Sequence, residues 1–150
     1  MNRNGFTLIE LLAVIVVIGL IMLIAVPNIV GLSTGVRKDQ MLDDAKKLIS
    51  MAKYKVNTDA DIRAFTKASI CNGTSCTLSF ELLNANGDIT NDPDGGSYMT
   101  GSQVIYRTVS GTVGGTVDYC VTLIGSKRTI GVPTCVKESE LYSRSKVQDK

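Results

Sequence analysis

An almost unbroken run of apolar residues dominates the pattern of the chain. It extends from Phe6 to Val26, and within it only Thr7 and Glu10 are distinctly polar. As a helix, these 21 residues would span about 31 Å, close to the roughly 30 Å of hydrocarbon in a bilayer. The pattern therefore predicts a membrane-spanning helix over residues 6–26, because a helix satisfies its own backbone groups in lipid.

Residues 27–57 follow with an amphipathic pattern. Their apolar positions recur at gaps that are mostly three or four, with charged residues between them, which is typical of one face of a helix. We expect one helix from about Thr7 to about Lys55, with a kink at Pro27 because proline removes a backbone hydrogen bond. The apolar positions are Ile29, Leu32, Val36, Leu42, Ala45, Leu48, Ile49, Ala52 and Val56.

Residues 58–150 are predicted to form a globular part, because the pattern changes to short segments divided by turns. Three segments are strand candidates, joined by short glycine-containing connections that favour an antiparallel meander. They read SQVIYRTVS, TVDYCVTLI and KRTIGVPTCV. Their apolar face would cover the apolar stripe of the long helix. The expected fold class is therefore α+β: a long N-terminal helix packed against an antiparallel sheet of about three strands.

Two other segments of the globular part are less regular. TLSFELLNANGDI reads as a strand or a short helix, followed by an Asn-Gly turn. The tail from Ser139 to Lys150 is polar, and we expect it to be mobile.

The composition excludes several classes of function. With 16 basic and 14 acidic residues, the net charge is only +2, so no specific nucleic-acid partner is inferred. Histidine is absent, which removes the imidazole base and the histidine metal ligand. The sequence contains no recognisable nucleophile–base pair and no phosphate-binding loop, so we expect no catalytic residues and no enzyme activity.

Four cysteines lie in the C-terminal part of the chain: Cys71, Cys76, Cys120 and Cys135. An even number far from a membrane segment favours disulfides in an oxidising compartment. Three pairings are possible, and the simplest joins the local pairs, Cys71 with Cys76 and Cys120 with Cys135. A zinc site of four cysteines is the weaker alternative, because the fourteen residues between the last two cysteines are a poor spacing for zinc.

Glu10 is the feature of the apolar run that a plain membrane anchor does not explain. A carboxylate within a membrane helix costs up to about 2.5–3.5 kcal/mol, and such residues usually have a partner. If the chain were cut between Gly5 and Phe6, the new α-amine would lie roughly 6 Å from Glu10 along the helix axis. That amine, on the same chain or on a neighbour, is a natural partner in a low dielectric.

Two rival interpretations of the apolar run fit less well. A secretory signal peptide has a shorter apolar core followed by a small-residue cleavage site, and AVPNIVG is a poor match to such a site. An uncut bitopic receptor or adhesin, which would retain residues 1–5, leaves Glu10 unexplained.

The stretch GFTLIELLAVIVVIGLIMLIAVP, residues 5–27, resembles the N-terminus of type IV pilins and pseudopilins. In that family a short leader ends in glycine and precedes Phe-Thr-Leu-[Ile/Val]-Glu-Leu, a long apolar run and a proline. The resemblance implies that a prepilin peptidase removes the leader, residues 1–5, by cutting after Gly5, and then N-methylates Phe6. It also implies that Glu10 pairs with the N-terminus of an adjacent subunit during assembly.

The same resemblance implies the partners and the location of the protein. The chain would be the structural subunit of a type IV pilus, a helical filament of identical subunits built with an assembly ATPase and a platform protein. It would cross the cytoplasmic membrane once before assembly and belong to a cell-surface fibre afterwards. The alternative is a pseudopilin of a type II secretion or DNA-uptake system, and the presence of long surface fibres distinguishes the two.

A second stretch has a weaker family resemblance. ITNDPDGGSY, residues 89–98, resembles the DPWG…Y loop of major secretion pseudopilins, without its tryptophan. Asp88, Asp92 and Asp94 are candidate ligands there, because Ca²⁺ prefers hard oxygen donors. Turn chemistry at Pro93 and the following glycines explains the loop without a metal. We therefore expect no cofactor, with calcium as the alternative.

Overall fold

A computed structural model of the chain describes residues 7–109 and 115–150, apart from the side chains of residues 23–32. The long helix is α1 (Leu8–Thr58), close to its expected extent. The short helices are α2 (Ala60–Arg63), α3 (Phe80–Leu83) and the 3-10 helices η1 (Glu138–Glu140) and η2 (Arg144–Lys146). The strands are β1 (Ser75–Ser79), β2 (Gln103–Thr108), β3 (Val117–Ile124), β4 (Arg128–Ile130), β5 (Val136–Lys137) and β6 (Val147–Asp149).

The chain divides into two compact units, Met1–Val36 and Arg37–Lys150. The first contains the beginning of α1, and the second contains the rest of α1 and the whole sheet. Pro27 belongs to α1, but its side chain lies outside the described residues, so the kink stays a prediction. The predicted membrane segment, residues 6–26, lies only partly within the described residues.

In the described part of the chain, no helix combines the length and the hydropathy of a membrane span.

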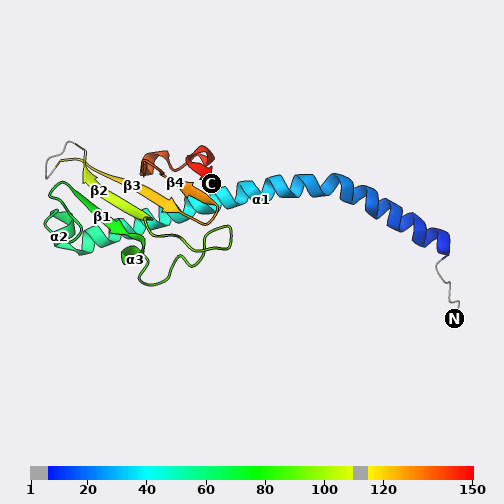
Figure 1. Ribbon diagram of the computed structural model, residues 1–150, viewed down its shortest axis with the longest axis horizontal. Coiled ribbons are helices and arrows are strands. Elements are labelled where there is room, and N and C mark those ends of the chain that lie inside the picture. The colour runs from blue at the N-terminus through cyan, green and yellow to red at the C-terminus, as the bar shows by residue number, and fades with distance from the viewer. Residues whose placement is uncertain (1–6, 110–114) are drawn as a thin grey trace. The chain divides into compact units, whose positions relative to one another are not determined.

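In the second unit, α1 contributes one buried face to the core. Of the apolar positions predicted from the sequence, Val36 at the unit boundary is 53% exposed, whereas six others are no more than 4% exposed. Met41, which the periodicity did not single out, is fully buried beside them. The six are Leu42, Ala45, Leu48, Ile49, Ala52 and Val56. They join one hydrophobic cluster with residues of the sheet, which lies along the second half of α1 (Figure 1).

The sheet is antiparallel, in the order β1-β2-β3-β4-β6, with β5 paired to β3. The first two strand candidates correspond to β2 and β3. The third divides into β4 and β5, so the sheet has more strands than the pattern suggested. Gly131 explains the division: its φ is +70°, and a Cβ there would lie 2.4 Å from the carbonyl oxygen of Val121. Only glycine fits that turn.

The segment TLSFELL contains both of the elements that its pattern allowed. Strand β1 ends at Ser79, and the Ser79 hydroxyl then caps α3 by accepting a hydrogen bond of 3.3 Å from the amide of Leu82.

The prediction that the tail, residues 139–150, is mobile is wrong. Residues 138–149 form η1, η2 and β6, and β6 pairs with β4 in the register Ile130↔Val147. Two apolar side chains explain the order, because Leu141 is 1% exposed and Val147 is 3% exposed within the core. Two apolar positions within a polar segment are too few to produce a recognisable period.

The cysteines form two local disulfides, Cys71–Cys76 and Cys120–Cys135. The first closes a turn next to β1, where Cys71 and Cys76 also form an isolated bridge of the backbone. The second ties β3 to the turn before β5. Both bridges hold segments of the second unit against its core.

Replacing Cys120 and Cys135 together with alanine should lower the free energy of unfolding by about 3 kcal/mol in the chain-entropy model, because their sequence separation is 15 residues. The matched control replaces Cys71 and Cys76, separated by 5 residues, and should lose about 1 kcal/mol less. Each pair has one fully buried member, so the packing losses are comparable. Urea unfolding of the full chain in detergent, followed by circular dichroism, measures both losses. Equal losses would contradict the dependence on loop length.

Candidate functional site

The start of α1 is organised by a reciprocal capping interaction between Thr7 and Glu10. The amide and the hydroxyl of Thr7 both donate to Oε2 of Glu10, at 2.9 Å each. The amide of Glu10 donates back to the Thr7 hydroxyl oxygen at 3.4 Å. This is a capping box, which satisfies amide groups that the first turn of a helix leaves unpaired. The sequence contains the pattern of a capping box, Thr-x-x-Glu. The sequence analysis did not use this pattern, because it interpreted Glu10 as the partner of an α-amine.

The capping box fixes where the carboxylate of Glu10 lies. It places the negative charge at the N-terminal end of α1, where the helix dipole favours an anion. All three hydrogen bonds use Oε2 or the Glu10 amide, so Oε1 takes no part in them. Gly5 and Phe6, the predicted cleavage and methylation positions, lie outside the described residues.

Apart from Glu10, the first turns of α1 are apolar on every side and exposed in the single chain. Twelve large apolar side chains between Leu8 and Met22 are 46–82% exposed. A helix that is apolar all round is normally buried by lipid or by other protein. The described part of this segment therefore offers a surface for helix packing, interrupted by one carboxylate.

The candidate calcium loop is held by hydrogen bonds and ion pairs of the protein itself. Asp92 is 4% exposed, and its Oδ1 accepts hydrogen bonds of 2.9 Å from the amides of Asp94 and Gly96. Its Oδ2 accepts from the amide of Ser126. Burial raises the pKa of the Asp92 carboxyl, but the hydrogen bonds from Ser126, Gly96 and Asp94 outweigh it, so the pKa lies below its usual range.

Asp94 pairs with two guanidinium groups. Its Oδ1 accepts from Nη1 of Arg37 at 3.2 Å and from Nη1 of Arg128. Arg128 also donates from Nε to Asp149 on β6 at 2.9 Å. This cluster links α1, the loop, β4 and β6 within the second unit.

The three candidate calcium ligands do not come together as one metal site. Asp88 instead accepts a hydrogen bond of 2.6 Å at its backbone carbonyl from the ammonium of Lys47. Across residues 7–109 and 115–150, no group of three acidic or cysteine side chains is arranged to hold a metal ion. The guanidinium groups of Arg37 and Arg128 supply the positive charge beside Asp94. Arg128 and Asp94 lie 34 residues apart in sequence.

The loop is also tied to α1 by Tyr98, whose hydroxyl donates to Oδ2 of Asp44 at 2.6 Å. Burial raises the pKa of the Asp44 carboxyl more than this hydrogen bond lowers it. Burial likewise raises the pKa of the Tyr98 hydroxyl. The loop is therefore a structural element of the second unit, anchored at both of its ends.

Replacing Arg128 with methionine should lower the free energy of unfolding by roughly 2–3 kcal/mol. The change leaves the Asp94 side chain, 2% exposed, with Arg37 as its remaining ion-pair partner. The matched control is Arg107→Met, because Arg107 is 40% exposed and lies 3.7 Å from Asp118, a geometry that contributes at most about 1 kcal/mol. Urea unfolding measures both changes. An equally small loss in the two variants would contradict the structural role of the cluster.

Comparison with known proteins bears on the N-terminal part alone. None of the curated proteins and none of the solved structures that were compared with the chain matches it. Residues 1–26 match the family described as the prokaryotic N-terminal methylation motif. This match covers Gly5, Phe6, Glu10 and the apolar run that carried the resemblance noted from the sequence. The chain therefore carries the N-terminal signature of type IV prepilins, which pilins and pseudopilins share.

Proposed function

We propose that the protein is the structural subunit of a type IV pilus, cleaved between Gly5 and Phe6 and assembled through its N-terminal helix. The observation that carries the proposal is the all-round apolar segment of α1 with one carboxylate near its start. Within a motif that marks prepilins, this segment has the features of a shared filament core: apolar surface for packing and one charge for alignment.

Before assembly, residues 6–26 anchor the chain in the cytoplasmic membrane and residues 58–150 lie outside the cytoplasm. The two disulfides support this orientation, because disulfides persist in oxidising compartments. The continuation of the helix, residues 27–57, connects the anchor to the globular part. In this arrangement the apolar segment is covered by lipid until neighbouring subunits replace the lipid.

During assembly, Glu10 pairs with the α-amine of Phe6 in an adjacent subunit. The capping box supports this role, because Thr7 holds the carboxylate at the helix start while Oε1 stays available to another chain. A carboxylate that enters an apolar core without a partner is strongly disfavoured. The pairing therefore selects the axial position at which neighbouring helices pack.

The partners of the proposed function follow from the motif. A prepilin peptidase removes residues 1–5 and methylates Phe6, and an assembly ATPase with a platform protein extracts the subunit into the fibre. The protein itself has no catalytic role, and its main partner is a second copy of the same chain.

The alternative is a pseudopilin of a type II secretion or DNA-uptake system. Residues 89–98 favour it, because they resemble the corresponding loop of secretion pseudopilins. A pilus produces long surface fibres, whereas a pseudopilus is confined to the cell envelope, so shearing cells and imaging the released material separates the two.

Replacing Glu10 with alanine should leave a processed, membrane-inserted chain but reduce sheared filaments at least about tenfold, because an unpaired neighbouring amine would be left in the apolar core. Glu10→Gln separates charge from capping, since its amide oxygen still accepts from Thr7 but carries no charge. We expect both variants to remain in the membrane fraction and to yield few sheared filaments, as measured by immunoblotting of the two fractions. Normal filaments in Glu10→Ala would show that the carboxylate has no role in assembly.

Replacing Gly5 with leucine should leave the leader on the chain. Glycine has no side chain, so it allows close approach of an enzyme to the peptide bond that follows it. Intact-mass spectrometry of the membrane fraction should show a chain that begins at Met1, whereas the wild-type chain begins at methylated Phe6. The control is Asn4→Ala, which should be cleaved normally. A Gly5→Leu chain that still begins at Phe6 would show that cleavage does not require glycine, and a chain that begins at another residue would place the processing site elsewhere.

A further inference from the structure

The second unit contains two asparagines that are each followed by glycine, Asn72-Gly73 and Asn86-Gly87. Both asparagines are exposed. Both glycines have a positive φ, +90° at Gly73 and +72° at Gly87. The two pairs are therefore alike in sequence, in exposure and in the backbone region of the glycine. They differ in the contacts that hold the asparagine side chain.

An asparagine that precedes glycine can lose ammonia without an enzyme. Hydroxide removes the proton of the glycine amide, and the nitrogen attacks Cγ of the asparagine to close a five-membered succinimide. The Cγ–Nδ2 bond breaks, and the nitrogen takes a proton from water and leaves as ammonia. Water then opens the ring at either carbonyl carbon, which gives aspartate or isoaspartate. Glycine favours the attack because it has no Cβ beside the nitrogen.

The side chain of Asn72 is held by its neighbours. Its Oδ1 accepts hydrogen bonds from the amide and the hydroxyl of Ser75, at 2.9 and 3.0 Å. It also accepts from the amide and the hydroxyl of Thr74, at 3.3 and 3.4 Å. The Cys71–Cys76 disulfide closes this turn. Ring closure requires the carboxamide to turn towards the next nitrogen in the chain, so these contacts oppose the reaction.

Asn86 lies in a loop, residues 85–88, in which every residue is exposed. Among the described residues, the Asn86 carboxamide has no hydrogen-bond partner. The side chain of Asn84 ties the two ends of the loop, because it bonds the carbonyl and the amide of Ile89, at 2.7 and 2.9 Å. Within the loop, the amide of Gly87 donates to the carbonyl oxygen of Asn84 at 2.9 Å. This is the bond that the attacking nitrogen must break.

The two sites therefore differ in what must open before the ring can close. At Asn86 it is one backbone hydrogen bond in an exposed loop, and such loops open at a low cost in free energy. At Asn72 the nitrogen of Gly73 is not held in this way, but the carboxamide is held by four hydrogen bonds within a turn that a disulfide closes. Each of these bonds adds to the barrier.

We propose that Asn86 is a site of spontaneous modification, at which the folded chain converts to aspartate or isoaspartate, and that its contacts protect Asn72 from the same reaction. The inference goes beyond the proposed filament function and does not depend on it. The reaction needs only the folded chain and water.

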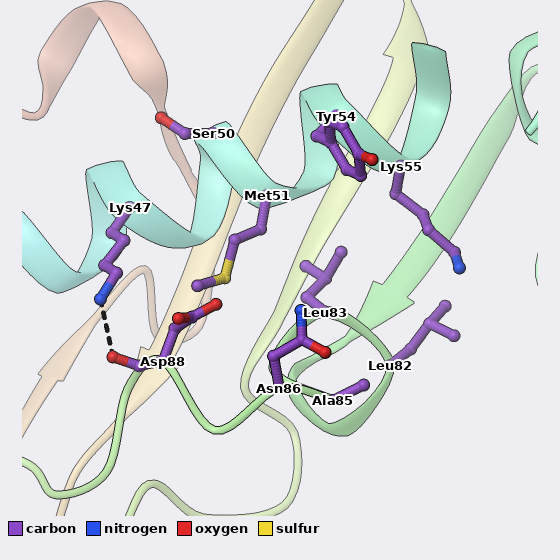
Figure 2. A pocket seen from close by; sticks show the side chains of 10 residues that line it. All are labelled: Lys47, Ser50, Met51, Tyr54, Lys55, Leu82, Leu83, Ala85, Asn86 and Asp88. Atoms are coloured by element: carbon purple, nitrogen blue, oxygen red, sulfur yellow. Dashed lines mark hydrogen bonds between the residues drawn. The ribbon is translucent and has the colours of Figure 1, made fainter. Parts of the chain in front are cut away.

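The modification would change the charge of a pocket of about 510 Å³ that Asn86 lines together with the last turns of α1 (Figure 2). The charged side chains of its lining are those of Lys47, Lys55 and Asp88, so two positive charges and one negative charge give +1. A carboxylate at position 86 would lower this sum to zero. Isoaspartate would also lengthen the backbone of the loop by one carbon atom.

Mass spectrometry of the purified full chain tests the inference. The chain is incubated in detergent in a mildly alkaline or an acidic buffer, and fragmentation of its peptides locates the modification and distinguishes isoaspartate from aspartate. We expect Asn86 to convert at least about tenfold faster than Asn72, as a difference of one or two net hydrogen bonds implies. Conversion should be faster in the alkaline buffer, because hydroxide removes the amide proton. A synthetic peptide of residues 81–90 measures the rate without the fold.

Three variants test the restraints separately. Replacing Cys71 and Cys76 together with alanine should accelerate the reaction at Asn72 and leave the rate at Asn86 unchanged. Asn84→Ala, which removes the tie to Ile89, should accelerate the reaction at Asn86 alone. Asn86→Gln should abolish the reaction there, because its longer side chain would have to close a six-membered ring. Melting temperatures show whether each variant remains folded.

The wild-type chain alone decides the inference. Conversion of Asn72 at the rate of Asn86 or faster would overturn it, as would an Asn86 that stays intact while the peptide of residues 81–90 converts. Conversion at Asn86 with little change at Asn72 would support it. Either result leaves the filament proposal standing, because the yield of sheared filaments is measured independently.

Discussion

The structure depends most on one constraint: the first part of α1 is apolar on every side and needs a cover. Twelve large apolar side chains between Leu8 and Met22 are exposed in the single chain. Fully burying one such side chain contributes about 1.5–3 kcal/mol, whereas a carboxylate at the centre of a membrane helix costs about 2.5–3.5 kcal/mol. Burial therefore decides the behaviour of the segment, and Glu10 is a small perturbation. Lipid and neighbouring helices satisfy the same requirement, so in the proposed assembly a subunit would exchange one for the other on leaving the membrane for a fibre.

Apolar burial alone does not define how neighbouring helices align, because the hydrophobic effect is not directional. Alignment needs groups whose energy depends strongly on position. Glu10 is the one ionised group within the described apolar segment, and Thr7 holds it at the helix start. In the proposed assembly, a neighbour that offers an amine at that point would be favoured, and a neighbour displaced along the axis would leave a buried charge without a partner. The apolar surface would then supply the driving force, and the single carboxylate would supply the register.

The sequence predicted those features that depend on local patterns. The helical period identified the buried face of α1, and the short segments divided by glycine-containing turns identified β2 and β3. Features that depend on distant residues were missed. The pairing of Asp94 with Arg128 joins residues 34 positions apart, and no spacing rule reveals it. The tail is ordered because Leu141 and Val147 are buried in the core, and this packing depends on residues distant in sequence. The capping box at Thr7 was also missed, although its Thr-x-x-Glu pattern is local. Glu10 had been interpreted as the partner of an α-amine, and its capping role was not considered.

The ordered tail changes how the globular part can contribute to assembly. A mobile tail would lose conformational entropy on binding, which opposes the contact that it makes. Here Leu141 and Arg144 fix the segment in the free subunit, so that cost is already met during folding. The surface of this segment is therefore ordered before any contact forms. In the proposed assembly, packing of the apolar helices would bring the globular parts near one another, and an ordered surface would favour some of their relative rotations over others. Helix burial would then drive association, and the ordered surface of the globular part would limit the orientations that neighbouring subunits adopt.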